Sequence, residues 1–158
     1  MLRYKQFLKI PEDEIVDGIL QLHESVFKGS NMLVEKIKSK PKVLINVALD
    51  QSTVVGYKIG YELNSDKYYS WYGAVHEEYR GKGVASRLLD QQHCYLVKSG
   101  YQIVQTKTRN KWRSMLILNI KKGFNVMETF TDDEGIHRIV LEKKLSTNKM
   151  SVNRIPND

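Results

Sequence analysis

Apolar residues recur every three or four positions in four segments of the chain, and this spacing predicts four helices. The first opens at Pro11 with a proline and three acidic residues, which suit the positive end of a helix. The second is short and stops before Pro41. The expected helices span residues 11–27, 32–38, 84–98 and 112–121.

Apolar residues that alternate with polar or small ones predict strands between these helices. The clearest alternation runs from Thr53 to Leu63, where Val55, Tyr57 and Ile59 share one face. Short polar turns at residues 50–52 and 132–135 indicate two hairpins. After an N-terminal strand, the expected strands span residues 42–49, 53–63, 68–75, 102–108, 124–130 and 136–145.

The order of these elements, βααβββαβαββ, predicts a mixed α/β fold. Antiparallel hairpins lie on either side of a strand–loop–helix–strand unit, whose two strands are parallel and need a right-handed crossover. We expect one domain over residues 1–145, with a twisted mixed sheet of six or seven strands, largely antiparallel with a central parallel pair, and helices on both faces. Residues 146–158 are polar and are expected to form a frayed tail.

The composition places the chain among globular proteins of a reducing compartment. Apolar residues make up 41% of its 158 residues, and no apolar run approaches the ~18 residues of a membrane span. The N-terminus lacks the apolar core of a signal peptide, and Cys94 is the single cysteine, so no internal disulfide can form. We therefore expect a cytoplasmic protein without a membrane partner.

The formal net charge of +7 is concentrated in the second half of the chain. Residues 80–158 contain 15 Lys and Arg against 7 Asp and Glu, whereas residues 1–79 contain 10 and 11. One interpretation is a solvated basic face with a basic tail. The other is a site for a polyanion, either nucleic acid or a phosphorylated cofactor.

The excess of positive charge begins at a glycine loop, EEYRGKGVASRLLD at residues 77–90. A glycine loop between a strand and a helix favours anion binding, because the first helical N–H groups lack partners and glycines let a phosphate approach the backbone. Arg80 and Lys82 add full charges. The spacing is not that of a Walker A loop, and Ser86 replaces the third glycine of the dinucleotide motif. An ordinary tight turn is the alternative.

The segment from Arg80 to Ala85 resembles the [Q/R]xxGx[G/A] signature of the GNAT superfamily of N-acetyltransferases. Its context strengthens the resemblance, because the loop follows a strand ending Gly73-Ala74-Val75 and opens an amphipathic helix. The stretch MLILNIKKGF at residues 115–124 is similar to the second helix of the family and the Gly-Phe after it. The resemblance covers residues 42–145.

This resemblance implies that acetyl-CoA is the cosubstrate and that no metal is needed. The pyrophosphate would bind the backbone amides of the loop, and the pantetheine arm would lie along the strand that ends at Ala74 and Val75. That strand splays from the next one, residues 102–108, and the cleft holds the thioester, whose oxygen would be bound by backbone N–H groups of residues 72–75. The implied cofactor-binding residues are Ala74, Val75, Arg80, Gly81, Lys82, Gly83, Val84, Ala85 and Asn119.

Asn119 departs from the family pattern, because many members have a tyrosine there that is thought to protonate the departing thiolate. An amide can orient the cofactor but cannot replace a phenol as proton donor, so the acid role is open to Tyr72 or water. For the base we considered Glu62 and Glu24, each of which can equally be a surface acid. His76 is expected to pack in the loop, and the other histidines and Cys94 lack metal-ligand spacing.

We therefore predict an N-acetyltransferase that moves an acetyl group to a primary amine by direct attack in a ternary complex. The acceptor is a small molecule or a peptide, with Tyr72 and Glu62 as candidate catalytic residues. One alternative is a catalytically silent acyl-CoA-binding protein, which Asn119 favours. A basic nucleic-acid-binding module is the less favoured one, so we expect no nucleic-acid partner. A homodimer is compatible with the sequence.

Overall fold

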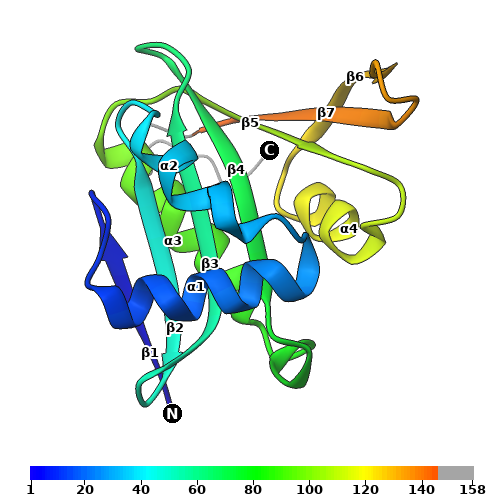
Figure 1. Cartoon of the computed structure of the whole chain (residues 1–158). Coiled ribbons are helices and arrows are strands. Elements are labelled where there is room, and N and C mark those ends of the chain that lie inside the picture. The colour runs from blue at the N-terminus through cyan, green and yellow to red at the C-terminus, as the bar shows by residue number, and fades with distance from the viewer. Residues whose placement is uncertain (146–158) are drawn as a thin grey trace. The chain divides into compact units, whose positions relative to one another are not determined.

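The computed structural model describes residues 1–145, and within them the helices and strands follow the predicted order (Figure 1). The strands are β1 (Leu2–Phe7), β2 (Leu44–Asp50), β3 (Thr53–Glu62), β4 (Lys67–Val75), β5 (Ile103–Thr108), β6 (Asn125–Thr131) and β7 (His137–Lys144). The α-helices are α1 (Asp13–Val26), α2 (Leu33–Lys38), α3 (Val84–Lys98) and α4 (Arg113–Lys121). Short 3₁₀ turns cover Ser30–Met32 and Glu77–Tyr79. The expected polar tail, residues 146–158, lies outside the described residues.

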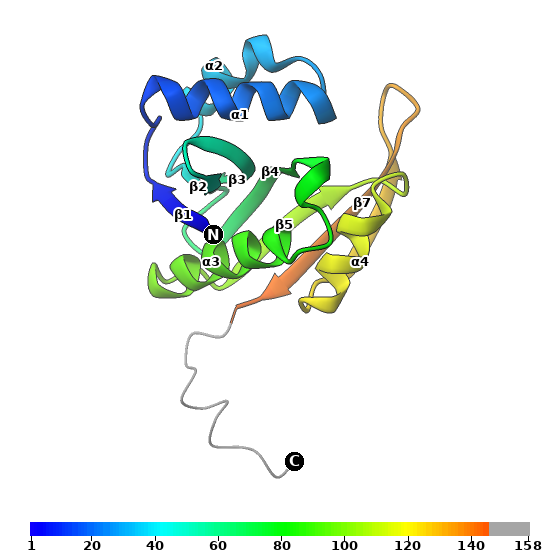
Figure 2. The same cartoon turned by 90° about the horizontal axis from the view of Figure 1, so that it is seen from below.

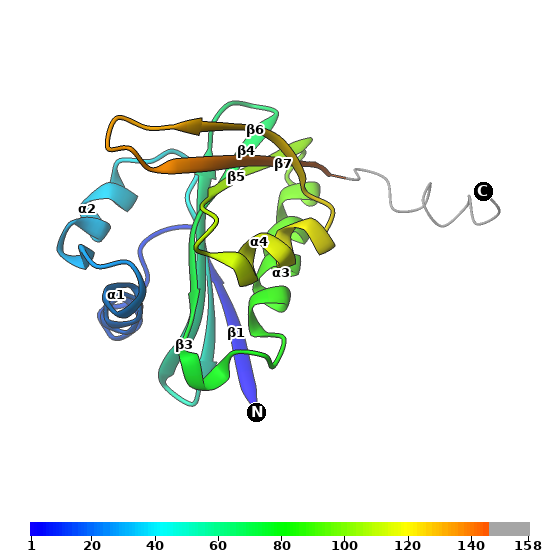
Figure 3. The same cartoon turned by 90° about the vertical axis from the view of Figure 1, so that its right-hand side faces the viewer.

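The chain divides into two compact units, and the first comprises Met1–Leu63 and Tyr69–Gln92. Its strands follow the order β1-β2-β3-β4, and β1 with β2 and β2 with β3 pair antiparallel. Figure 3 shows α1 and α2 on one face of these strands and the beginning of α3 on the other. The prediction of helices on both faces is therefore confirmed for this unit.

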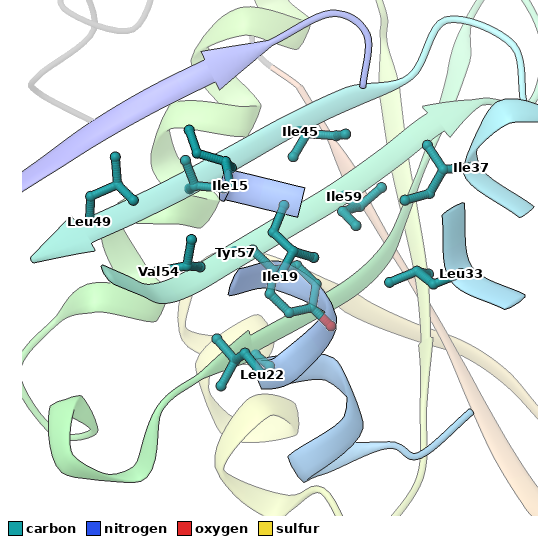
Figure 4. Packing of buried hydrophobic residues seen from close by; sticks show 12 residues of the cluster. Ile15, Ile19, Leu22, Leu33, Ile37, Ile45, Leu49, Val54, Tyr57 and Ile59 are labelled. Carbon is teal, nitrogen blue, oxygen red and sulfur yellow. The ribbon is translucent and has the colours of Figure 1, made fainter. Parts of the chain in front are cut away.

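The main core of the first unit lies between its strands and the helices α1 and α2 (Figure 4). Branched side chains from β2 and β3 face it, and the helices contribute residues at the predicted helical spacing. Burial of such side chains is the main favourable contribution to folding. The labelled members are Ile15, Ile19, Leu22, Leu33, Ile37, Ile45, Leu49, Val54, Tyr57 and Ile59.

Helix α1 approaches β3 closely at Gly18. A Cβ on this glycine would lie 2.6 Å from Val54 Cγ2, a distance that real side chains do not tolerate. The absence of a side chain at this position therefore sets how deeply the helix sits on the sheet. Such contacts between rigid elements fix the position of β3, whose neighbour β4 leads into the glycine loop.

A second apolar cluster holds the first turns of α3 against the opposite face of the same strands. Its buried members are Ala48, Val55, Val75, Val84 and Leu88. Val75 is the last residue of β4 and Val84 is the first of α3, so this cluster fixes both ends of the intervening loop.

Within the described residues, the second unit comprises Asn64–Tyr68 and residues 93–145, with strand order β5-β7-β6. Figure 2 shows β5 and β7 side by side, and β5 with β7 and β6 with β7 pair antiparallel. Lys67 Nζ and Gln105 Nε2 both donate to Glu142 Oε2, at 2.8 and 2.7 Å. The β6–β7 turn is tied by Arg138, whose Nε donates to Asp132 at 2.9 Å. The predicted second hairpin is thus confirmed.

Candidate active site

The glycine loop has a backbone that only glycine adopts easily. Gly81 and Gly83 have φ angles of +74° and +83°, in the left-handed region where side chains are strained. A Cβ on either would meet nothing within 4 Å. These glycines are therefore required by the backbone conformation and not by packing, and the space beside them is open to a ligand.

The loop delivers the chain into the N-terminus of α3. At this N-terminus, the Arg87 N–H donates a helical hydrogen bond to the Gly83 carbonyl at 3.0 Å. The N–H groups of Val84 and Ala85 precede it, and the first N–H groups of a helix have no intrahelical acceptor. Together with the helix dipole they form a site that favours an anion such as a phosphate.

Basic side chains surround this loop in fixed positions. Arg80 Nε donates to the Val75 carbonyl at 2.9 Å, which ties the loop to the last residue of β4. The Lys82 ammonium lies 5.5 Å from the centroid of the Tyr79 ring, and the Arg87 guanidinium lies 4.4 Å from that of Tyr4. These contacts keep positive charge near the helix N-terminus without neutralising it.

Tyr79 and His76 support the loop from its first half. The Tyr79 hydroxyl donates to the Asp50 carboxylate, and this bond raises the pKa of Tyr79. His76 Nδ1 accepts from the Glu78 N–H at 3.1 Å, and its backbone N–H donates to Val55 O at 2.8 Å. The prediction that His76 packs in the loop is confirmed.

Strand β4 places different residues on its two faces. Ala74 is buried in the main core, and Tyr72 packs half-buried against that core. Gly73 and Val75 turn toward the face that carries α3, since Val75 belongs to the cluster around Val84. The segment proposed to hold the thioester therefore separates a core-facing side, with Tyr72, from a side facing α3.

A buried histidine–tyrosine pair lies next to Tyr72, and the sequence analysis missed it. His23 Nδ1 and the Tyr57 hydroxyl are hydrogen-bonded at 2.6 Å. The rings of His23 and Tyr72 are nearly perpendicular, and their centroids lie 4.8 Å apart. Burial lowers the pKa of His23 and raises the pKa of Tyr57, so both are neutral near pH 7. His23 follows Ile19 by four residues, and this spacing could have predicted its burial.

A buried lysine on β3 was also missed. Lys58 is 8% exposed, and burial lowers its pKa to about 8. Its position between Gly56 and Gly60 places it on the face of β3 that carries α3. The alternation along β3 was visible in the sequence, but whether a helix covered this face was not.

Asn119 is buried on α4, as its place on an apolar helix face predicts. It is 3% exposed. The backbone carbonyl of Asn119 accepts from the N–H of Phe124 at 3.0 Å, which closes the helix. Ile120, one of the apolar residues whose spacing predicted this helix, is 52% exposed.

The two candidate bases lie apart from the loop. Glu24 is exposed, and its Oε1 accepts a hydrogen bond from the Ser30 N–H at 3.0 Å. That bond lowers the pKa of Glu24. The side chain therefore caps the turn that follows α1. Glu62 is half-buried at the end of β3. It lies four residues beyond Lys58, or ~13 Å along a strand at ~3.3 Å per residue.

The other histidine and cysteine candidates, His93 and Cys94, lie within packed structure and do not form a site. His93 is buried, and its Nδ1 lies 3.2 Å from Lys143 Nζ, whereas Cys94 is half-buried. Over residues 1–145, no group of three or more His, Cys, Asp or Glu is arranged to hold a metal ion. No helix among these residues has the length and apolar character that a membrane crossing requires.

Comparison with known proteins identifies relatives of this arrangement. The family model described as Acetyltransferase (GNAT) domain matches residues 41–126, which is more than half of the chain. A search of curated proteins finds no match. The fold class predicted from the sequence, a mixed α/β fold with a largely antiparallel sheet, is confirmed by many solved structures.

Three of these structures show the extent of the similarity. Ard1 from Thermoplasma volcanium is 15% identical with a TM-score of 0.80, over 92% of this chain and 98% of that one. The ribosomal-protein-S18-alanine N-acetyltransferase from Escherichia coli is 14% identical with a TM-score of 0.77, over 94% and 96%. A GNAT family acetyltransferase from Elizabethkingia anophelis with acetyl-CoA bound is 15% identical with a TM-score of 0.71, over 91% and 98%. At such identities the likeness shows the fold.

Proposed function

The chain belongs to the GNAT family of acetyltransferases, and from this premise we propose that it transfers the acetyl group of acetyl-CoA to a primary amine. The observation that carries the proposal is the open glycine loop at the N-terminus of α3. Two positive-φ glycines leave empty space there, and basic side chains are held around it. This arrangement fits a pyrophosphate, and the similar structure from Elizabethkingia anophelis contains acetyl-CoA.

Each residue proposed for the cofactor has a definite task. The backbone amides of Arg80, Gly81, Lys82, Gly83, Val84 and Ala85 would bind the pyrophosphate, and Ala74 and Val75 would line the pantetheine arm. Asn119 would donate or accept one hydrogen bond. N–H groups of residues 72–75 would stabilise the thioester oxygen as it gains negative charge during attack. Bound acetyl-CoA supplies the activated acetyl group.

The acceptor must reach the thioester as a neutral amine, and a base is needed to remove its proton. Tyr72 belongs to the segment proposed for the thioester, and beside it lies the His23–Tyr57 pair. Glu62, at the end of β3, stays in the proposal as a base that acts through intervening water. Without a tyrosine at position 119, the acid role falls to Tyr72 or water. A thiolate that leaves unprotonated would cost about 1.4 kcal/mol near neutral pH, because a free thiol has a pKa of ~8.5.

The direct test is a screen for coenzyme A release. Amines, polyamines, amino acids, aminoglycosides and peptides with free N-termini are incubated with acetyl-CoA and the protein, and free thiol is measured. Release with one acceptor class, and acetylated amine as its product, supports the proposal. Tight acetyl-CoA binding without transfer to any amine favours the silent acyl-CoA-binding protein. Steeply salt-dependent binding to nucleic acid, with no effect of acetyl-CoA, favours the third function.

Gly83→Asp should weaken acetyl-CoA binding at least ~10-fold, which corresponds to ~1.4 kcal/mol. The substitution places a carboxylate where the pyrophosphate would bind, and the two negative charges repel each other. Isothermal titration calorimetry measures the change. Gly100→Asp is the matched control, since Gly100 also has positive φ, at +90°, and open space around it, but lies at the other end of α3. Equal affinity in a folded Gly83→Asp protein would remove the loop from the site.

Asn119→Ala should weaken acetyl-CoA binding by about 10-fold, the effect of one lost hydrogen bond. Turnover at saturating substrate should change little, because an amide does not transfer a proton. Asn119→Tyr should raise turnover if protonation of the thiolate limits the rate. Calorimetry and steady-state kinetics separate the two effects. A loss of turnover above ~10³-fold in Asn119→Ala with intact binding would make this residue catalytic.

A further inference from the structure

Lys58 lies inside the protein on the face of β3 that α3 covers. A Cβ on Gly56 would be 3.0 Å from Val84 Cγ1 and 3.2 Å from Leu88 Cδ1, which shows that this face of β3 meets α3. Lys58 follows Gly56 by two positions and so shares that face. Figure 1 shows the first turns of α3 running behind β3. A lysine in such a place is rare, because burial of a charge is costly.

The Lys58 side chain extends across β4 at Gly73. A Cβ on Gly73 would lie 3.3 Å from Lys58 Nζ and 3.8 Å from Lys58 Cγ. The missing side chain at position 73 therefore makes room for the lysine. Gly73 is the second residue of the segment 72–75, so the amine lies against the backbone that the proposed function assigns to the thioester.

Nothing in the described residues neutralises this amine. No carboxylate, carbonyl or hydroxyl within residues 1–145 accepts a hydrogen bond from Lys58 Nζ, and no ion pair forms. Burial alone lowers its pKa to about 8. At pH 8, Lys58 is consequently a neutral amine in roughly half of the protein molecules, and the neutral amine is the nucleophilic form.

Two further residues of the first unit contain buried polar atoms without partners, and one of them lies directly opposite Lys58. Asn46 is the residue directly opposite on β2; its Nδ2 donates to Gln6 at 2.9 Å, but its buried Oδ1 has no partner. Gln92 follows Leu88 by one helical turn on α3, and its amide oxygen and nitrogen are both buried and unpaired. Buried polar groups are normally satisfied, so this side of the strands is equipped to receive another hydrogen-bonding group.

We propose that Lys58 is an acetyl acceptor of the protein itself, modified by acetyl-CoA bound along β4. The inference rests on the proposed function. The neutral Nζ attacks the thioester carbonyl, an N–C bond forms, the C–S bond breaks, coenzyme A leaves as the thiolate, and the nitrogen loses one proton to water. No oxidant or further reactant is required. The product is an uncharged amide, whose N–H and carbonyl suit a buried polar site better than an ammonium does.

The test compares Lys58 with exposed lysines of the same chain. The folded protein is incubated with trideuteroacetyl-CoA at pH 8 without an acceptor, and the site of label is found by proteolysis and mass spectrometry. Lys5 and Lys38 are exposed controls. A buried amine should react slowest with reagent from solution, whereas delivery from a bound cofactor should label it at least ~10-fold faster than the controls. Parallel samples contain excess coenzyme A, Lys58→Met protein or Gly83→Asp protein.

Preferential label at Lys58 that is suppressed by coenzyme A and by Gly83→Asp supports the inference. Acetyl-CoA binding or transfer to an external amine with Lys58 unlabelled overturns it and leaves the proposed function standing. Label at Lys5 and Lys38 equal to or above that at Lys58 also overturns it, as chemical acetylation from solution. Absence of acetyl-CoA binding overturns both the inference and the proposed function. Lys58→Met serves only to confirm the site, so the result does not depend on its folding.

Discussion

Lys58→Met is expected to raise the free energy of unfolding by on the order of 3 kcal/mol at pH 7. The pKa of Lys58 falls from 10.5 to about 8, because burial disfavours the charged form and no acid compensates for it. Each pKa unit corresponds to about 1.4 kcal/mol. Methionine has a similar length and no charge, so it fills the same space beside Gly73 without the desolvation cost.

The pH dependence of this difference has a defined sign. Below pH 8 the lysine is protonated in the folded and the unfolded chain, and the folded state carries the full cost of the buried charge. Between about pH 8 and 10.5 the unfolded chain binds more protons, so the stability of the wild-type protein rises with pH. The advantage of Lys58→Met should therefore be largest below pH 8 and shrink toward pH 10.5.

Urea unfolding at pH 7 and pH 10, followed by circular dichroism, measures both expectations. Lys38→Met is the matched control, since Lys38 is exposed at the end of α2 and should change stability by no more than ~0.5 kcal/mol. Equal stability of Lys58→Met and wild type at pH 7 would mean that water reaches the ammonium. In that case the amine would also lack the reactivity that self-acetylation requires.

The elements of the fold could be predicted because each has a local signal. The spacing of Ile15, Ile19 and Leu22 predicts the first helix, and the observed α1 buries these three side chains. The turn after β2 likewise predicted the observed hairpin. The expected common face of Val55, Tyr57 and Ile59 is wrong, because an irregularity in the β2–β3 register turns Val55 toward α3 while the other two face the main core. These signals depend on spacing within one element, which a single sequence displays directly.

The glycine loop was predictable for a different reason, namely backbone geometry. A glycine pair between a strand and a helix predicts positive φ angles, and both Gly81 and Gly83 have them. What the spacing could not reveal is the use of Arg80, whose Nε is committed to the Val75 carbonyl. From the sequence, Arg80 was a free charge for phosphate, whereas in the structure it also fixes the loop on β4.

The buried polar residues escaped prediction because their burial depends on neighbours distant in the chain. His23 is 34 residues from its partner Tyr57, and Lys58 is buried by the approach of β4 and α3. The sequence gives the face of a strand but not the element that covers it. Ile120 illustrates the converse, since it belongs to the apolar spacing that predicted α4 and yet its side chain is exposed.

The rate of acetyl transfer is expected to rise by up to ~10³-fold between pH 6 and pH 9. The attacking amine must be neutral, and the neutral fraction of an amine with a pKa near ~10.4 grows ~10-fold per pH unit below that value. Asn119 stands where a phenol would donate a proton, so no acid is expected whose deprotonation would slow the reaction. The measurement is thiol release against pH with the best acceptor of the screen, at subsaturating acceptor.

Stability must be controlled in the same experiment, because folded protein is needed at every pH. The unfolding midpoint of wild-type protein should rise and not fall toward alkaline pH as Lys58 loses its proton, so unfolding should not limit the rate at pH 9. A bell centred near neutrality would contradict the expectation and reveal a titrating acid. His23→Gln would then distinguish the buried pair from other groups: a falling limb that disappears in this variant would assign the acid to the His23–Tyr57 pair beside Tyr72.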